Sequence, residues 1–103
     1  MDSVAHRELM ARTPEGKEFS ITVRLGQPYK STDSEWACPV SIEGLHENLR
    51  DIRGVDSWQS LQLAFCLALD LLASFVEDGG RLFWRDSEEP IDIKDLAPKT
   101  PNQ

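Results

Sequence analysis

Cysteine and histidine side chains could supply nucleophilic or metal-binding chemistry, and the chain has two of each: Cys38, Cys66, His6 and His46. A metal site needs three or four ligands at workable spacing, and neither histidine has a second histidine or cysteine at helical or strand spacing. The phosphate-binding patterns G-x-x-x-x-G-K and G-x-G-x-x-G do not occur in the sequence. We therefore expect no metal and no cofactor.

Nucleophilic catalysis would use Cys38 or Ser57 as the nucleophile and His46 as the general base. Cys38 lies in an alternating stretch that predicts an inward side chain, where a thiol is normally unreactive. Ser57 is accounted for as a helix-capping residue. A small enzyme that uses Cys38 or His46 is therefore kept as the alternative, and it requires His46 within hydrogen-bond reach of Cys38 at the surface of a pocket.

The composition favours a protein partner over a nucleic acid or a membrane. The 103 residues carry a formal net charge of −7, and an acidic chain without a basic stripe argues against binding to phosphates or anionic lipids. The first twenty residues contain no apolar h-region, so we expect no export signal and a cytoplasmic protein. The longest apolar run, Leu61 to Val76, is interrupted by polar residues and does not predict a membrane span. In that setting we expect both cysteines to be reduced core thiols, with a disulfide as the minority alternative.

The stretch from Gly54 to Gly80 predicts one long helix. Asp56 or Ser57 can cap its first turn, and Gly79-Gly80 supplies a left-handed stop. A stripe of apolar residues at helical spacing is expected to face a sheet, and it comprises Trp58, Leu61, Phe65, Ala68, Leu72 and Phe75.

Two leucines of this helix fall outside the expected core face. Leu63 and Leu67 are four residues apart, on the face that also carries Asp70 and Ser74. Either the connection 45–55 or the C-terminal segment covers them, or they form a self-association or partner surface. Leu63, Leu67 and Asp70 are therefore the candidate interaction residues.

The remaining chain predicts short strands. Residues 17–25 alternate cleanly between apolar and polar side chains, and the T-P-E-G-K turn before them makes the N-terminal segment a pairing strand. Residues 26–35 read as a loop by composition. Residues 36–43 predict a third strand, in which Pro39 requires an edge or a bulge. Residues 45–55 read as a polar connection, 81–85 as a fourth strand, and 90–93 as an optional fifth at an edge.

These elements predict an α+β fold. We expect an antiparallel sheet of four to five strands with one long helix packed on one face, in the order strand–strand–strand–helix–strand. A single domain should span residues 1–97, and residues 98–103 should form a disordered tail.

Two stretches carry a resemblance: W-A-C-P-V-S-I-E-G-L at Trp36–Leu45 and G-V-D-S-W-Q-S-L-Q-L-A at Gly54–Ala64. With R-L-G-Q-P at Arg24–Pro28 and R-L-F-W at Arg81–Trp84, the chain resembles a family of small uncharacterised bacterial proteins with a domain of unknown function. The resemblance covers most of residues 4–85 and ends where the acidic C-terminal segment begins. It implies a shared domain and no particular chemistry.

The sequence thus predicts a small non-enzymatic protein-interaction or accessory domain. An immunity-type role is an analogy from size and charge alone. The partner is expected to be a protein, and homodimerisation through the helix or an edge strand remains open.

Overall fold

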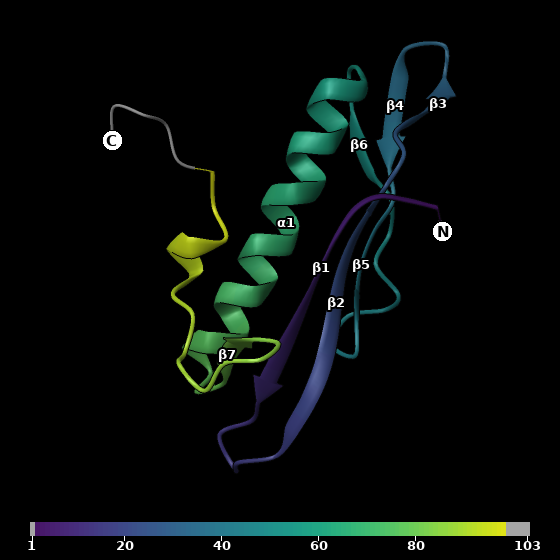
Figure 1. Ribbon diagram of the computed structural model, residues 1–103. Coiled ribbons are helices and arrows are strands. Elements are labelled where there is room, and N and C mark those ends of the chain that lie inside the picture. The colour runs from purple at the N-terminus through teal and green to yellow at the C-terminus, as the bar shows by residue number, and fades with distance from the viewer. Residues whose placement is uncertain (1, 99–103) are drawn as a thin grey trace.

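The computed structural model describes residues 2–98. Within them, one long helix packs on a four-stranded antiparallel sheet, and a smaller three-stranded sheet adjoins it, so the predicted α+β fold is confirmed (Figure 1). The elements in chain order are β1 (Ser3–Arg12), β2 (Glu18–Gly26), β3 (Tyr29–Thr32), β4 (Glu35–Cys38), β5 (Val40–Glu43), β6 (Ile52–Gly54), α1 (Ser57–Glu77), β7 (Arg81–Trp84) and a 3-10 turn at Ile93–Asp95.

The larger sheet has the strand order β5-β2-β1-β7. The alternation predicted for residues 17–25 holds, because Ile21 and Leu25 are buried while Ser20 is exposed. Leu9 of β1 stands opposite Ile21 of β2, so both enter the core on the same face. The N-terminal segment is the predicted strand, and it pairs antiparallel with both β2 and β7.

The smaller sheet has the order β3-β4-β6 and was not predicted as a separate unit. The expected loop at residues 26–35 is wrong in part: β3 and β4 form a hairpin whose turn is at Asp33 and Ser34. β3 is mostly solvent-exposed and polar, so it lacks the hydrophobic alternation that marks a half-buried strand. The three-residue β6 adds to β4 inside the predicted polar connection.

The predicted third strand, residues 36–43, divides at Pro39 into two strands that belong to different sheets. Proline has no N–H to donate to a ladder, and its carbonyl instead accepts a hydrogen bond from the backbone of Gly26 at 2.8 Å. Ala37, just before the division, is buried in the smaller sheet, whereas Val40, just after it, is buried in the larger one. The chain therefore passes from one sheet to the other where pairing is interrupted.

The long helix begins and ends as predicted. The side chain of Asp56 accepts a hydrogen bond from the amide of Gln59 at 2.8 Å, which makes Asp56 the N-cap. Gly79 follows the helix with φ +101°, a conformation that favours glycine. β6 passes against the first turn so closely that a Cβ on Gly54 would lie 2.6 Å from the backbone nitrogen of Ser60.

The core face of α1 is narrower than predicted. Its fully buried residues are Ser60, Ala64, Ala68 and Leu72. Trp58, expected in the core, is 73% exposed, and Cys66, expected as a core thiol, is also exposed. The helix is long and apolar enough for a membrane span by length and composition alone, but in this fold its buried residues pack on the sheets.

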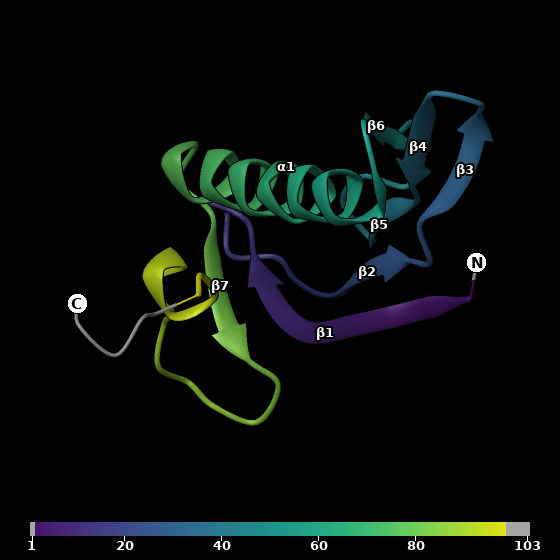
Figure 2. The ribbon, with the colours of Figure 1, turned by 90° about the horizontal axis from the view of Figure 1, so that it is seen from above.

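The core consists of two clusters of buried side chains. β7 lies near the C-terminal end of α1 and the smaller sheet near its N-terminal end (Figure 2). The first lies under the C-terminal half of the helix, where β7 joins the sheet, and contains Leu9, Ala11, Ile21, Ile42, Leu72, Leu82 and Ile91. The second lies under the N-terminal half, near the smaller sheet, and contains Leu25, Cys38, Val40, Ala64 and Ala68.

The segment after β7 turns back along it. Pro90 forms a single bridge with Phe83 in place of the predicted edge strand, and Ile91 donates a backbone hydrogen bond to Leu82 at 2.7 Å. A 3-10 turn at Ile93–Asp95 follows, capped by Asp92. The predicted disordered tail lies outside the described residues except for Pro98.

Candidate functional site

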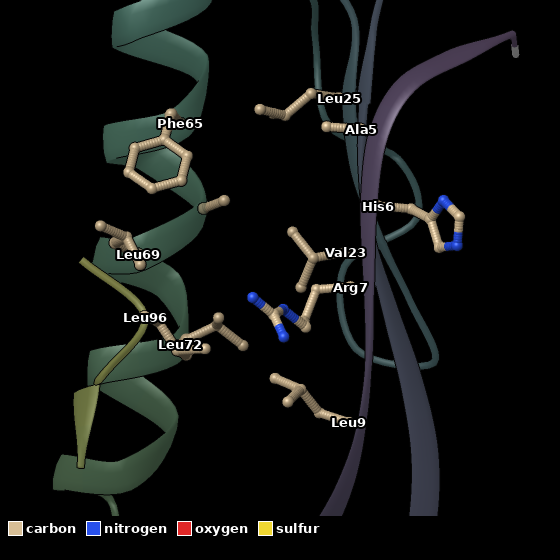
Figure 3. Close-up of a pocket in the computed structure, with 11 residues that line it drawn as sticks. Ala5, His6, Arg7, Leu9, Val23, Leu25, Phe65, Leu69, Leu72 and Leu96 are labelled. Atoms are coloured by element: carbon tan, nitrogen blue, oxygen red, sulfur yellow. The ribbon is translucent and has the colours of Figure 1, made fainter. Parts of the chain in front are cut away.

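An open apolar cleft lies between α1 and the N-terminal half of β1, with a volume of about 200 Å³ (Figure 3). β1, β2, α1 and the C-terminal segment all contribute to it. The residues that line it are Ala5, His6, Arg7, Leu9, Val23, Leu25, Phe65, Ala68, Leu69, Leu72 and Leu96. The side chain of His6 points away from the cleft, whereas that of Arg7 points toward the helix.

The cleft stays open because β1 supplies nothing large and apolar to fill it. Side chains alternate along a strand, so Ala5, Arg7 and Leu9 share the face that looks toward the helix. Only Leu9 is buried; Ala5 and Arg7 are exposed. Phe65 and Leu69 of α1 therefore face a short side chain and a charged one and remain half-buried.

The backbone of β1 has an unpaired edge beside this cleft. β2 runs along the whole of β1, but β7 pairs only with Leu9–Arg12. Residues 4–8 are all exposed, and no strand in the part of the chain that the structure describes lies on their other side. An unpaired strand edge presents a row of N–H and C=O groups that can accept another strand.

The register shows which backbone groups face that edge. The carbonyl of Leu82 accepts a hydrogen bond from the amide of Ile91, which lies on the side of β7 opposite to β1. The backbone N–H and C=O of Leu82 therefore point away from β1. Because successive residues of a strand alternate, the N–H and C=O of the next residue, Phe83, point toward β1, where Met10 is its partner. Because these directions alternate along a strand, His6 and Glu8 direct their N–H and C=O groups to the same side as Met10. β7 ends at Trp84, opposite Leu9, so Arg85 still lies beside Glu8, where the two side chains form an ion pair, and His6 lies beyond it.

A second hollow extends the cleft toward the start of the helix. It is lined by Leu25, Trp58, Leu61, Gln62 and Phe65 and shares Leu25 and Phe65 with the first. Trp58, which lines this hollow from the first turn of the helix, is 73% exposed. From Trp58 to Leu69 the helix advances roughly 16 Å. We call this continuous surface, together with the edge at His6 and Glu8, the β1–α1 groove.

Arg7 provides the positive charge in the groove. Its guanidinium carbon lies 5.0 Å from the centre of the Trp84 ring, which orients the side chain by a cation–π contact. The ion pairs of the described residues involve Arg12, Arg24, Arg53 and Arg85. Arg7 takes part in none of them, so its charge is available to a ligand.

Cys38 and His46 are not brought together as a catalytic pair. Cys38 is fully buried, burial raises the pKa of its thiol, and its Sγ lies 3.4 Å from the carbonyl oxygen of Gly26. His46 lies in the turn after β5 and is held by backbone hydrogen bonds to Ile42. No hydrogen bond in the described chain joins the two side chains. Residues 2–98 also contain no group of three or more potential metal ligands.

The candidate interaction residues on the helix lie on its other flank. Leu63 is 43% exposed and Asp70 is exposed, but Leu67 is half-buried and packs against the second core cluster. Two residues along a helix correspond to a rotation of about 200°. Leu63 therefore faces away from Phe65, and Leu67 away from Leu69. The candidate residues Leu63, Leu67 and Asp70 are not part of the β1–α1 groove.

Sequence reasoning missed Ala5 and Arg7. The helix-facing positions of β1 read Ala5, Arg7, Leu9 and Ala11, and only the last two are buried. A charged residue at an inward position is rare in a closed core. Arg7 was therefore a signal that the first half of this strand is not covered.

Comparison with known proteins gives one assignment. No curated protein and no solved structure matches the chain significantly. The family model described as Domain of unknown function (DUF6968) matches residues 5–93, which include both walls of the groove and extend past Arg85, where the resemblance seen in the sequence ended. The chain therefore belongs to this family, a domain of unknown function.

Proposed function

We propose that this domain is a non-enzymatic protein-interaction module that binds an extended segment of a partner protein in the β1–α1 groove. The observation that carries the proposal is the unpaired edge at His6 and Glu8, which lies directly beside an apolar cleft. A bound segment would continue the sheet as an added strand and place alternate side chains against Phe65 and Leu69. This is the mode of β-strand addition.

The main-chain part of such binding is sizeable but not large. The N–H and C=O of His6 and the N–H of Glu8 can form up to three hydrogen bonds, worth roughly 1 kcal/mol each in water. The cost of association takes up much of this gain, so burial of apolar side chains must add to it. We expect a dissociation constant on the order of 10–100 μM for a short peptide.

The size of the groove matches a short segment. The helical wall from Trp58 to Leu69 is roughly 16 Å long, and five residues of an extended strand span about 17 Å. The cavity of about 200 Å³ can take one or two apolar side chains of such a segment. A folded partner would need to present its segment at an exposed edge or terminus.

The charge of the chain supports a protein as the partner. Its net charge of −7 disfavours nucleic acids and anionic membranes. We propose a cytoplasmic setting for this partner. An enzyme built on Cys38 is the less favoured alternative, since a buried thiol with a raised pKa is a poor nucleophile.

A second copy of this chain is the rival occupant of the edge. Two β1 strands could pair antiparallel about a two-fold axis and form one continuous sheet. Sedimentation of the wild-type protein and of His6→Pro separates the two cases. If the wild-type protein is a dimer and His6→Pro is a monomer, the edge serves self-association. If the wild-type protein is itself a monomer, the edge is available to a different protein.

The test is selection from a phage library of random peptides of about seven residues, followed by titration of a selected peptide into nitrogen-15-labelled protein. We expect amide shifts to change at residues 4–8 and 65–69. The variant His6→Pro removes an edge donor without removing a hydrogen bond to β2. It should bind the peptide at least about tenfold more weakly, because the missing bond and the added ring both oppose strand addition.

Leu63→Glu is the matched control, because it adds a charge to the opposite flank of the same helix. It should leave the affinity unchanged within about twofold. The proposal is wrong if the peptide shifts amides near Leu63, Leu67 and Asp70 and loses affinity in Leu63→Glu, since the interaction surface would then lie on the other flank. Equal binding by the wild-type protein and His6→Pro would also contradict it.

A further inference from the structure

We infer that Arg7 makes the β1–α1 groove selective for segments that carry a carboxylate next to an apolar residue, so that the carboxylate binds the guanidinium while the apolar side chain enters the cleft. The inference rests on the proposed function and specifies the chemistry of the partner. The carboxylate could be an Asp or Glu side chain or a free C-terminus, because the guanidinium binds either one.

The position of Arg7 supports this assignment. Its side chain extends from β1 into the space in front of α1, between Val23 and Leu72 (Figure 3). The walls around it are apolar, so water competes less for a bound anion there than on an open surface. A guanidinium presents its donors in a planar fork that matches both oxygens of a carboxylate.

Neighbouring charges do not neutralise Arg7. Glu8, the next residue, lies on the other face of β1 and pairs with Arg85. Trp84 holds the guanidinium by its ring and not by a hydrogen-bond acceptor. The N–H groups of Arg7 are therefore not taken up by an ion pair within residues 2–98. A charge that is held in place but lacks a counterion favours an anionic ligand.

The unpaired edge decides between two anionic ligands. A fatty carboxylate could place its head group on Arg7 and its chain along Phe65 and Leu69. It would leave the backbone groups of His6 and Glu8 without partners, whereas an extended peptide satisfies them and the charge together. The structure thus favours a peptide, and a fatty carboxylate becomes an outcome of the test.

The experiment compares two synthetic peptides in a titration followed by amide shifts and by Trp fluorescence. The first is the strongest acidic binder from the phage selection, and the second differs only by replacement of its Asp or Glu with Asn or Gln. Wild-type protein should bind the acidic peptide about tenfold more tightly, as expected for a charge-assisted hydrogen bond at a partly exposed site. Arg7→Gln should bind both peptides equally, and Arg7→Lys should recover part of the preference.

The outcomes distinguish the inference from the proposed function. Arg7→Gln keeps the hydrogen bonds between β1 and β2, and its amide spectrum away from the groove verifies that it folds. Selected peptides could bind in the groove and lose affinity in His6→Pro, yet bind equally well with Asp or Glu and with Asn or Gln. In that case the inferred selectivity of Arg7 for a carboxylate is wrong and the proposed function stands. If no peptide binds, or if His6→Pro has no effect, both are wrong.

Dodecanoate is the probe for the other ligand. Saturable binding of dodecanoate by the wild-type protein, lost in Arg7→Gln and unaffected in His6→Pro, would assign the groove to a fatty carboxylate and overturn the inference. Absence of saturable binding, together with the preference for the acidic peptide, would support it.

Discussion

The two halves of β1 belong to one strand and follow one alternation, but their surroundings differ. Residues 9–12 lie between β2 and β7, and Leu9 and Ala11 are 1% and 0% exposed. Residues 4–8 pair with β2 alone and are all exposed. The same helix faces both halves. Its C-terminal part meets a closed core, while Phe65 and Leu69 meet an open cleft.

β7 causes this difference. It supplies Leu82 and Trp84 to the face under the helix, and Pro90 and Ile91 follow as a further layer beside it. The backbone turns away directly after Trp84, where Ser87 donates a hydrogen bond to the Trp84 carbonyl. The open half of β1 is thus the part that a strand of only four residues cannot reach.

The largest contrast between the halves should appear in side-chain truncation. Leu9→Ala should lower the free energy of unfolding by about 3 kcal/mol, because it opens a cavity in the first core cluster. Val4→Ala, at a position that is 55% exposed, should change it by less than about 0.5 kcal/mol. Urea denaturation measures both, and similar losses in the two variants would show that the N-terminal half is buried.

Proline substitution tests the backbone in the same way. Met10 and His6 direct their N–H groups to the same side, but only Met10 has β7 as its neighbour. Met10→Pro should cost about 2 kcal/mol or more, through the lost hydrogen bond and the steric clash. His6→Pro should cost less than about 1 kcal/mol. Equal destabilisation in thermal unfolding would mean that the edge at His6 is already occupied.

Filling the cleft should close the open half. Ala5→Leu places a larger apolar side chain opposite Phe65 and Leu69, and we expect a gain of about 0.5–1 kcal/mol in the free energy of unfolding. The same variant should bind the selected peptide at least about tenfold more weakly. A loss of stability with unchanged peptide binding would place the side chain of residue 5 outside the cleft.

The smallest effect concerns the core behind the cleft, where Cys38 packs with Leu25 in the second cluster. Burial raises the pKa of this thiol above its usual 9.0. Above about pH 9 the unfolded chain ionises its thiol while the folded protein does not, so the stability present at neutral pH is lost as pH rises. Between pH 8 and pH 10 the free energy of unfolding should fall more for the wild-type protein than for Cys38→Ala.

Urea denaturation at the two pH values measures this difference. The same pH dependence in both proteins would indicate that Cys38 is accessible to solvent, and would restore the case for a reactive thiol. Alkylation of wild-type protein by iodoacetamide provides a check. Cys66 is exposed and should react in the folded state, whereas Cys38 should react only after unfolding.

The sequence predicted the elements whose local signals agree with their packing. Asp56 and Gly79 fix the ends of α1, and the alternation of residues 17–25 predicts β2. It did not predict β3, β6 or the division at Pro39, because short polar strands and a change of sheet leave no periodic pattern. The groove depends on where β7 ends relative to β1, and a register between distant strands cannot be read from either one alone.

Amide hydrogen exchange of the protein without any added ligand tests most directly whether the N-terminal half of β1 is an open edge. We expect the amides of His6 and Glu8 to exchange within about tenfold of the rate of an unstructured chain, because no strand among residues 2–98 accepts a hydrogen bond from them. The amides of Leu9 and Met10, paired with β2 and β7, should be protected at least about 100-fold. Protection of His6 and Glu8 equal to that of Met10 would contradict the account, since the edge would then be covered.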